Sequence, residues 1–193
     1  MLLDVSHPDM LENIIKLENI KNIPICIATT GYNESQIKQI EKLSLNTPVL
    51  FSSNYSLGVN LFNKLLEIAT PALMDNFDIE IIEMHHNQKV DAPSGTAKML
   101  YNTINNFKDY KEVDGRSGFS KRENNEIGIH ALRGGNIAGT HEVIYAGEDE
   151  ILSIKHQANS RKIFAKGMIV GAKWLLNKGN GLYDMNDVLF KIN

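Results

Sequence analysis

Apolar and polar positions follow two alternating rhythms along the first 56 residues. Short apolar runs, typical of buried strands, are separated by stretches in which apolar residues recur at helical spacing. Strands are expected at 1–5, 23–28 and 48–51, and helices at 8–17 and 34–43. This order predicts a parallel sheet with right-handed crossovers, and therefore an α/β fold class.

The pattern changes after Ser56. Amphipathic spacing predicts a long helix over 59–74, and its apolar residues near one face are Leu61, Leu65, Leu66 and Ile68. A strand is expected at 77–84, a helix at 96–107, three strands at 127–132, 139–146 and 150–157, and a last helix at 161–177. The polar stretch 108–125 is expected to be a loop. We expect the three later strands to form an antiparallel meander, within a mixed, largely antiparallel sheet.

Composition excludes several classes of partner. The net charge is −3, and basic residues are interspersed with acidic ones, so we expect no nucleic-acid surface. No apolar run reaches the roughly 18 residues of a membrane span, and the N-terminus lacks the features of a signal peptide. The single cysteine, Cys26, lies in an apolar run and is expected to be buried and structural. We therefore expect a cytoplasmic protein with no membrane partner.

The richest chemistry lies in residues 83–97, which read E-M-H-H-N-Q-K-V-D-A-P-S-G-T-A. His85 and His86 follow a predicted strand, and active residues of open α/β sheets gather at such carboxyl ends. Neighbouring strand residues point to opposite sides, so one imidazole can face a reacting atom while the other holds a ligand. From the residues alone, a pair of structural histidines is the alternative.

Two further features bear on this run. Ser94 is expected to cap the following helix, where Gly95 and Thr96 would present N–H groups at a positive dipole end; with Lys89 nearby, an anion pocket is favoured over an ordinary cap. A zinc site using the histidines and Glu83 is disfavoured, because neither H-E-x-x-H nor C-x-x-C spacing is present. We expect no metal.

The run resembles the signature E-x-H-H-x-x-K-x-D-A-P-S-G-T-A of the dihydrodipicolinate reductase family. The resemblance implies that the protein reduces 4-hydroxy-tetrahydrodipicolinate, a small dicarboxylate, to tetrahydrodipicolinate with NADPH or NADH, in lysine biosynthesis through diaminopimelate. It implies that His85 is the general acid and that Lys89 assists proton donation. His86, Gly95 and Thr96 would bind the substrate carboxylates. An imidazole suits the acid because its ordinary pKa lies near neutral pH.

Two more stretches resemble cofactor-lining segments of the family. One is like a G-T-T-G-F turn, with Ala28 where glycine is usual, and the other is like A-x-N-F-S-x-G-V-N. The resemblance assigns cofactor contacts to Ala28, Thr29, Thr30, Ser52, Ser53, Asn54 and Tyr55. Arg133 and His141 also lie in family-like motifs, and we interpret them as structural or interface residues.

The resemblance also implies a domain plan. Residues 1–56 would be an incomplete dinucleotide-binding domain, the remnant of a parallel Rossmann-type sheet. Residues 57–160 would be an α+β substrate-binding and oligomerisation domain, and 161–193 a C-terminal helix and tail that return to the first domain. A homotetramer is expected from the habit of the family.

The family's G-x-x-G-x-x-G loop, which holds the cofactor pyrophosphate, has no counterpart in the 193 residues. Three explanations are open: a truncated start, one piece of a split enzyme, or a degenerate, non-catalytic paralogue that acts as a diacid-binding or assembly module. We expect weak NADPH binding and detectable binding of pyridine-2,6-dicarboxylate by these residues.

Overall fold

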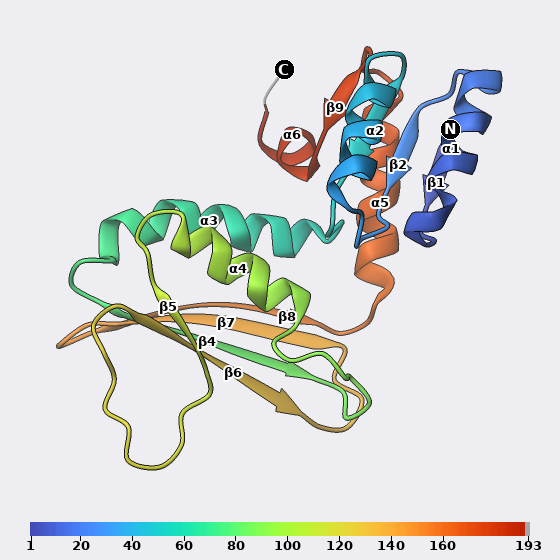
Figure 1. Ribbon diagram of the computed structural model, residues 1–193. Coiled ribbons are helices and arrows are strands. Elements are labelled where there is room, and N and C mark those ends of the chain that lie inside the picture. The colour runs from blue at the N-terminus through green and yellow to red at the C-terminus, as the bar shows by residue number, and fades with distance from the viewer. Residues whose placement is uncertain (192–193) are drawn as a thin grey trace. The chain divides into compact units, whose positions relative to one another are not determined.

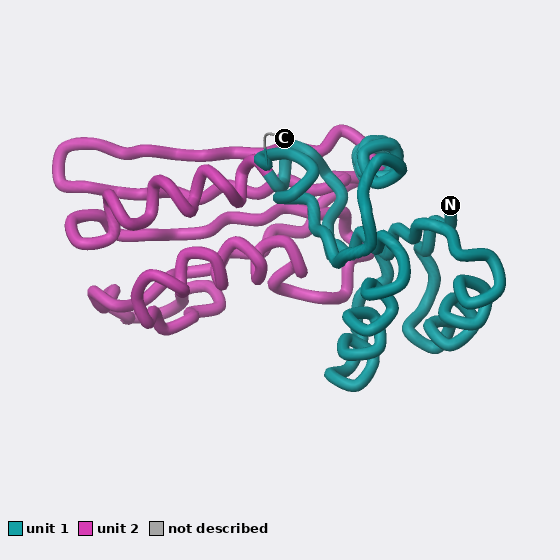
Figure 2. Tube along the Cα trace, turned by 90° about the horizontal axis from the view of Figure 1, so that it is seen from above, with its two compact units in different colours: residues 1–60, 162–193 teal, residues 61–161 magenta. Residues whose placement is uncertain are grey.

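The computed structural model describes residues 1–191 and divides into two compact units (Figure 2). Unit 1 combines residues 1–60 with the C-terminal segment from 162 onward, and unit 2 comprises residues 61–161. The expected C-terminal segment 161–193 ends in two residues that lie outside the described part of the chain.

Unit 1 is built on a parallel four-stranded sheet in the order β1-β2-β3-β9. Strands β1, β2 and β9 are labelled in Figure 1. The strands are β1 (Leu2–Asp4), β2 (Ile25–Ile27), β3 (Pro48–Phe51) and β9 (Gly181–Tyr183). The first three confirm the predicted βαβ order. The fourth was not predicted, because its three residues begin with a glycine and are not part of a longer apolar run as those of β2 are.

Helices cover both faces of this sheet, and the alternation of side chains along β2 shows why. Ile25 and Ile27 pack with the helices before and after β2, whereas Cys26 packs with those near the C-terminus. The helices are the short 3-10 helix η1 (Pro8–Met10), α1 (Leu11–Lys21), α2 (Glu34–Ser44), α5 (Lys162–Leu175) and α6 (Met185–Phe190). Burial raises the pKa of the Cys26 thiol to about 11, so this cysteine is a structural residue, as expected.

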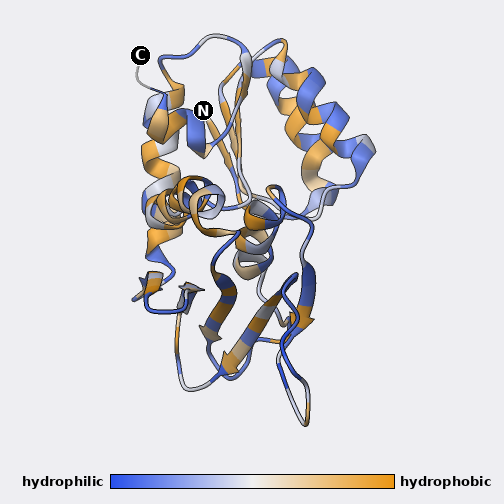
Figure 3. Cartoon of the chain, turned by 90° about the vertical axis from the view of Figure 1, so that its left-hand side faces the viewer, coloured by the Kyte–Doolittle hydropathy of each residue, from blue (hydrophilic) through white to orange (hydrophobic). Residues whose placement is uncertain are grey.

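Unit 2 is built on a five-stranded sheet in the order β5-β6-β4-β7-β8. The strands are β4 (Asp78–His85), β5 (Lys111–Asp114), β6 (Glu126–Arg133), β7 (Gly139–Ala146) and β8 (Ile151–Ala158). The helices are α3 (Leu57–Leu73), which begins in unit 1, and α4 (Gly95–Asn105). Both helices pack on one face of the sheet around a single apolar cluster (Figure 1). Polar and apolar bands alternate along the strands of this five-stranded sheet (Figure 3).

Two expectations for unit 2 were wrong. Strands β6 and β7 do not pair as a meander, because β4 lies between them, parallel to β6 and antiparallel to β7. The sheet as a whole is mixed, as expected, since β5–β6 is parallel and β7–β8 antiparallel. The expected loop 108–125 contains β5, which forms an edge strand with a charged sequence.

The expected apolar face of α3 is also different. Leu66 is fully buried, but Leu61, Leu65 and Ile68 are exposed. The inward face is instead completed by Phe62, one turn before Leu66. Within residues 1–191, no helix combines the length and the apolarity needed to cross a bilayer.

Candidate active site

The carboxyl end of β4 carries the predicted chemistry. His85 is the last residue of this strand, and its main chain is fixed on the turn after β6: Gly134 donates its N–H to the His85 carbonyl at 2.9 Å. The following loop is tied to the same turn, where Asn87 donates its N–H to the Gly135 carbonyl at 3.2 Å. The chain then passes through a cis Ala92–Pro93 bond into α4. The backbone therefore holds both histidines and the start of α4 at one end of the strand.

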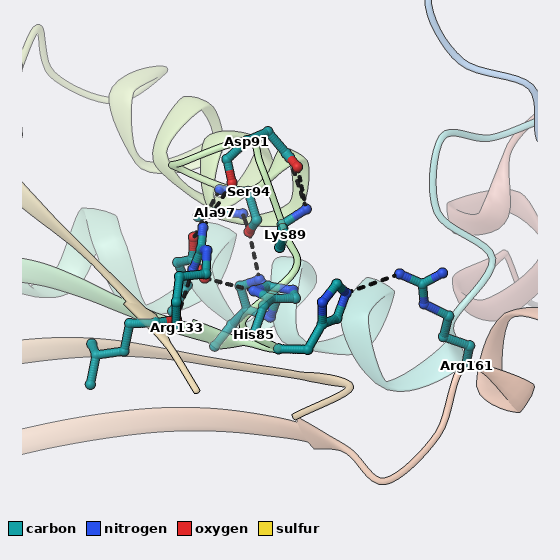
Figure 4. A network of polar contacts seen from close by, with 11 residues as sticks. His85, Lys89, Asp91, Ser94, Ala97, Arg133 and Arg161 are labelled. Carbon is teal, nitrogen blue, oxygen red and sulfur yellow. Dashed lines mark hydrogen bonds and ion pairs between the residues drawn. The ribbon is translucent and has the colours of Figure 1, made fainter. Parts of the chain in front are cut away.

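A fully buried carboxylate lies beneath His85. Glu83 Oε2 is 2.6 Å from His85 Nδ1, and the guanidinium of Arg133 donates to both oxygens of Glu83 at 2.8 Å (Figure 4). Ser94 donates its backbone N–H to Oε1 at 3.0 Å. Burial raises the pKa of Glu83, but the hydrogen bonds from Arg133 and His85 outweigh it, and the pKa is lowered overall. An ionised carboxylate only accepts hydrogen bonds, so His85 donates its Nδ1–H and presents Nε2 for chemistry.

His141 on β7 lies beside this pair. Its ring meets that of His85 edge to face, with centroids 5.1 Å apart, and its Nε2 lies 2.9 Å from Ser94 Oγ. Burial, followed by the neighbouring charge of His85, lowers the pKa of His141 to about 4. His141 is therefore neutral at pH 7, and it supports Ser94 rather than supplying protons.

Ser94 caps α4, as predicted: its Oγ accepts the N–H of Ala97 at 3.2 Å. Gly95 and Thr96 are the first two residues of the helix, at the end where first-turn N–H groups point toward a ligand. A side chain built on Gly95 would meet nothing within 4 Å, so this end of the helix is open to a ligand.

Two cationic side chains lie around this region. Lys89 is one-fifth exposed and donates to both carboxylate oxygens of Asp91, at 2.7 and 2.8 Å. This pair is tied to the cluster around His85, because Arg133, which holds Glu83, also donates to the main-chain carbonyl of Asp91 at 2.8 Å. His86 is half-buried, and Arg161 Nη2 lies 3.4 Å from its Nε2 (Figure 4). The sequence-predicted residues of the substrate site are therefore brought together in unit 2.

The predicted cofactor stretches belong to unit 1 and follow two adjacent parallel strands. Ala28 donates its N–H to the Asp4 carbonyl at 2.8 Å, and Ser52 donates its N–H to the Ile27 carbonyl at 3.1 Å. Both stretches thus lie at the carboxyl edge of the sheet, where open α/β sheets bind ligands. Thr30 and Ser53 are exposed there.

Three of these residues are turned inward. Thr29 is buried, and its Oγ1 accepts the backbone N–H of Ser6 at 2.9 Å. The Asn54 side chain accepts the N–H of Ser56 at 2.9 Å, and the hydroxyl of Tyr55 lies 2.8 Å from the Leu50 carbonyl oxygen within the core. Because the Tyr55 side chain is held in the core, only the backbone of this residue can contact a ligand.

Sequence patterns gave no catalytic role to the residues that organise His85. Glu83 was considered only as a possible zinc ligand and Arg133 only as structural, but both oxygens of Glu83 are occupied by Arg133, His85 and Ser94. Among residues 1–191, no group of three or more His, Cys, Asp or Glu side chains is arranged to hold a metal ion. The sequence feature that could have identified Glu83 is a charged residue at an inward-facing strand position, two residues before His85.

Comparisons with known proteins identify the family. Family models described as the N-terminus and the C-terminus of dihydrodipicolinate reductase match residues 1–55 and 58–189. A 4-hydroxy-tetrahydrodipicolinate reductase of Clostridium novyi is 49% identical over 98% of this chain and 76% of its own length. One from Brachyspira hyodysenteriae is 48% identical over 98% of this chain and 82% of its own length.

A solved structure supports the same family. A dipicolinate-bound dihydrodipicolinate reductase from Paenisporosarcina superposes with a TM-score of 0.78 at 25% identity, covering 95% of this chain and 71% of that one. The chain therefore belongs to the dihydrodipicolinate reductase family.

Proposed function

We propose that this protein reduces 4-hydroxy-tetrahydrodipicolinate to tetrahydrodipicolinate with NADH or NADPH, in lysine biosynthesis through diaminopimelate. The observation that carries the proposal is the Glu83–His85 pair at the end of β4, beside the capped start of α4. Its support is the family membership of the chain and the names of its relatives.

The reaction requires a hydride and a proton and releases the 4-hydroxyl group as water. The nicotinamide, when bound, supplies the hydride. His85 supplies the proton from Nε2, because Nδ1 is committed to Glu83. Lys89 assists this transfer with its positive charge, and it would exchange its pairing with Asp91 for a pairing with the substrate.

The substrate is a small dicarboxylate, and three residues are proposed to bind its carboxylates. Gly95 and Thr96 offer N–H groups at the start of α4, where the helix dipole favours an anion. His86 lies next to the exposed guanidinium of Arg161, so the surroundings of His86 are also cationic. The dipicolinate bound to the Paenisporosarcina enzyme has the same two carboxylates on a six-membered ring.

The cofactor is assigned to the two stretches at the carboxyl edge of the unit 1 sheet, Ala28–Thr30 and Ser52–Tyr55. Their exposed members, Thr30 and Ser53, follow neighbouring parallel strands, which fits the ligand-binding edge of a Rossmann-type sheet. We also propose a cytoplasmic homotetramer. The cytoplasm is supported by the single, buried, unpaired cysteine, and the tetramer by the habit of the family.

The test is an assay of NADPH oxidation with 4-hydroxy-tetrahydrodipicolinate, at NADPH concentrations raised until the rate saturates, so that weak cofactor binding does not hide turnover. Calorimetric titration with pyridine-2,6-dicarboxylate runs beside it. Substrate-dependent oxidation together with diacid binding is expected. Diacid binding without oxidation would contradict the proposed activity.

A further inference from the structure

Glu83 occupies a position where an apolar side chain would be expected. Inward-facing residues of β4 alternate along the strand, and the two before Glu83 on this face, Ile79 and Ile81, are fully buried. Glu83 is equally buried. A carboxylate is costly to bury unless it is paired and hydrogen-bonded, so its presence here calls for a role.

The hydrogen bonds of Glu83 fix its orientation. Oε1 accepts from Arg133 Nη2 and from the Ser94 N–H, while Oε2 accepts from Arg133 Nη1 and from His85 Nδ1. The two-pronged contact with Arg133 sets the plane of the carboxylate. The direction in which Glu83 meets the imidazole is therefore set by β6 and by the start of α4.

We propose that Glu83, held by Arg133, is the positioning residue of His85 and selects Nε2 as the atom that delivers the proton. This inference rests on the proposed function. When the doubly protonated ring gives up its Nε2 proton, the remaining proton stays on Nδ1. That tautomer is the one that the Glu83 carboxylate accepts from, so the pair stabilises the ring both before and after the transfer.

Glu83→Gln removes the charge and keeps the shape. The new amide can donate to Nδ1, which would leave the ring neutral with its proton on Nε2, a poor acid. The same strand offers a matched control. Glu80 contacts two arginines and one histidine, with Arg122 Nε at 3.2 Å, Arg116 Nη2 at 4.0 Å and His130 Nε2 at 2.9 Å, but none of these belongs to the proposed site.

The expected result is a fall of about 100-fold or more in kcat for Glu83→Gln, with a change of less than about threefold in the dissociation constant of pyridine-2,6-dicarboxylate. Glu80→Gln should keep the wild-type kcat. The fall in kcat at high pH, which reports loss of the acid's proton, should persist in Glu80→Gln and disappear in Glu83→Gln. The other charged or titratable groups of this cluster are His141 against the His85 ring, Arg133 on Glu83, and the Lys89–Asp91 pair next to Arg133; they are unchanged in both variants.

Two further measurements keep the inference open to refutation. Adding Glu83→Gln to His85→Gln should lower kcat no further, because Glu83 acts through His85. In the wild-type protein, NMR of isotope-labelled histidine should show the His85 proton on Nδ1 when the ring is neutral. A proton on Nε2, or wild-type kcat in a folded Glu83→Gln, would overturn the inference. An inactive wild-type protein would instead count against the proposed function.

Discussion

Gly139 on β7 faces the imidazole of His85 on β4. A Cβ built on Gly139 would lie 3.1 Å from His85 Nε2, the nitrogen assigned to proton delivery. The φ angle of Gly139 is +153°, a backbone conformation that L side chains rarely adopt. Glycine therefore keeps the space beside Nε2 open.

Gly139→Ala is expected to lower kcat about 10-fold or more, because the methyl group displaces the imidazole from its working position. Strain should also lower the free energy of unfolding by about 1 kcal/mol. Gly134→Ala is the matched control, since a Cβ at Gly134 meets nothing within 4 Å. Equal kcat values for the two variants would show that Gly139 has no part in placing His85.

Lys89→Ala should weaken binding of pyridine-2,6-dicarboxylate about 10- to 100-fold, as expected for loss of a charge-assisted contact. Lys98→Ala removes the same charge from an exposed position in α4 and should leave binding unchanged. Calorimetric titration measures both. Unchanged affinity in Lys89→Ala would remove this lysine from the site.

The buried imidazole of His141 should make the protein less stable in acid. Its pKa is about 4, below the ordinary value of 6.5, so between these values the unfolded state binds the proton and the folded state does not. The contribution of His141 to the free energy of unfolding is therefore fully present above pH 6.5 and is lost as the pH falls toward 4. Between pH 7 and pH 5 the loss is about 2 kcal/mol. Urea unfolding should show a larger loss in the wild type than in His141→Gln, where His156, whose pKa burial also lowers, still contributes. Equal losses in the two proteins would contradict the assignment.

Unit 1 depends on a close approach of α5 to the chain after β3. A Cβ on Gly167 would overlap the carbonyl oxygen of Tyr55, and backbone cannot move aside as a flexible side chain can. Gly167→Ala should therefore destabilise unit 1 by about 2 kcal/mol or more. Gly179→Ala, where nothing lies within 4 Å, should be close to neutral in thermal unfolding.

The sequence predicted those features that depend on local patterns. The helix expected at 34–43 is α2 (Glu34–Ser44), with Asn33 and Gln36 forming its capping box, and Ser94 caps α4 as expected. Strand order was beyond such patterns. Strand β4 lies between β6 and β7. The sequences of these strands do not specify which strand pairs with which.

The same limit explains what was missed at the site. Glu83 and Arg133 are 50 residues apart, and they meet because β4 and β6 pair in parallel with His85 opposite Arg133. Glu83 lies opposite His141 on the other side of β4. Motif chemistry predicted His85 as the acid, but the residues that contact its ring become visible only once the strand register is known.

Whether His85 is the general acid is decided by the kcat of His85→Gln in the NADPH oxidation assay, measured with the dissociation constant of pyridine-2,6-dicarboxylate for the same protein. We expect kcat to fall about 100-fold or more while the diacid affinity changes less than about threefold. A folded His85→Gln variant that binds the diacid and keeps the wild-type kcat would show that His85 is not the acid.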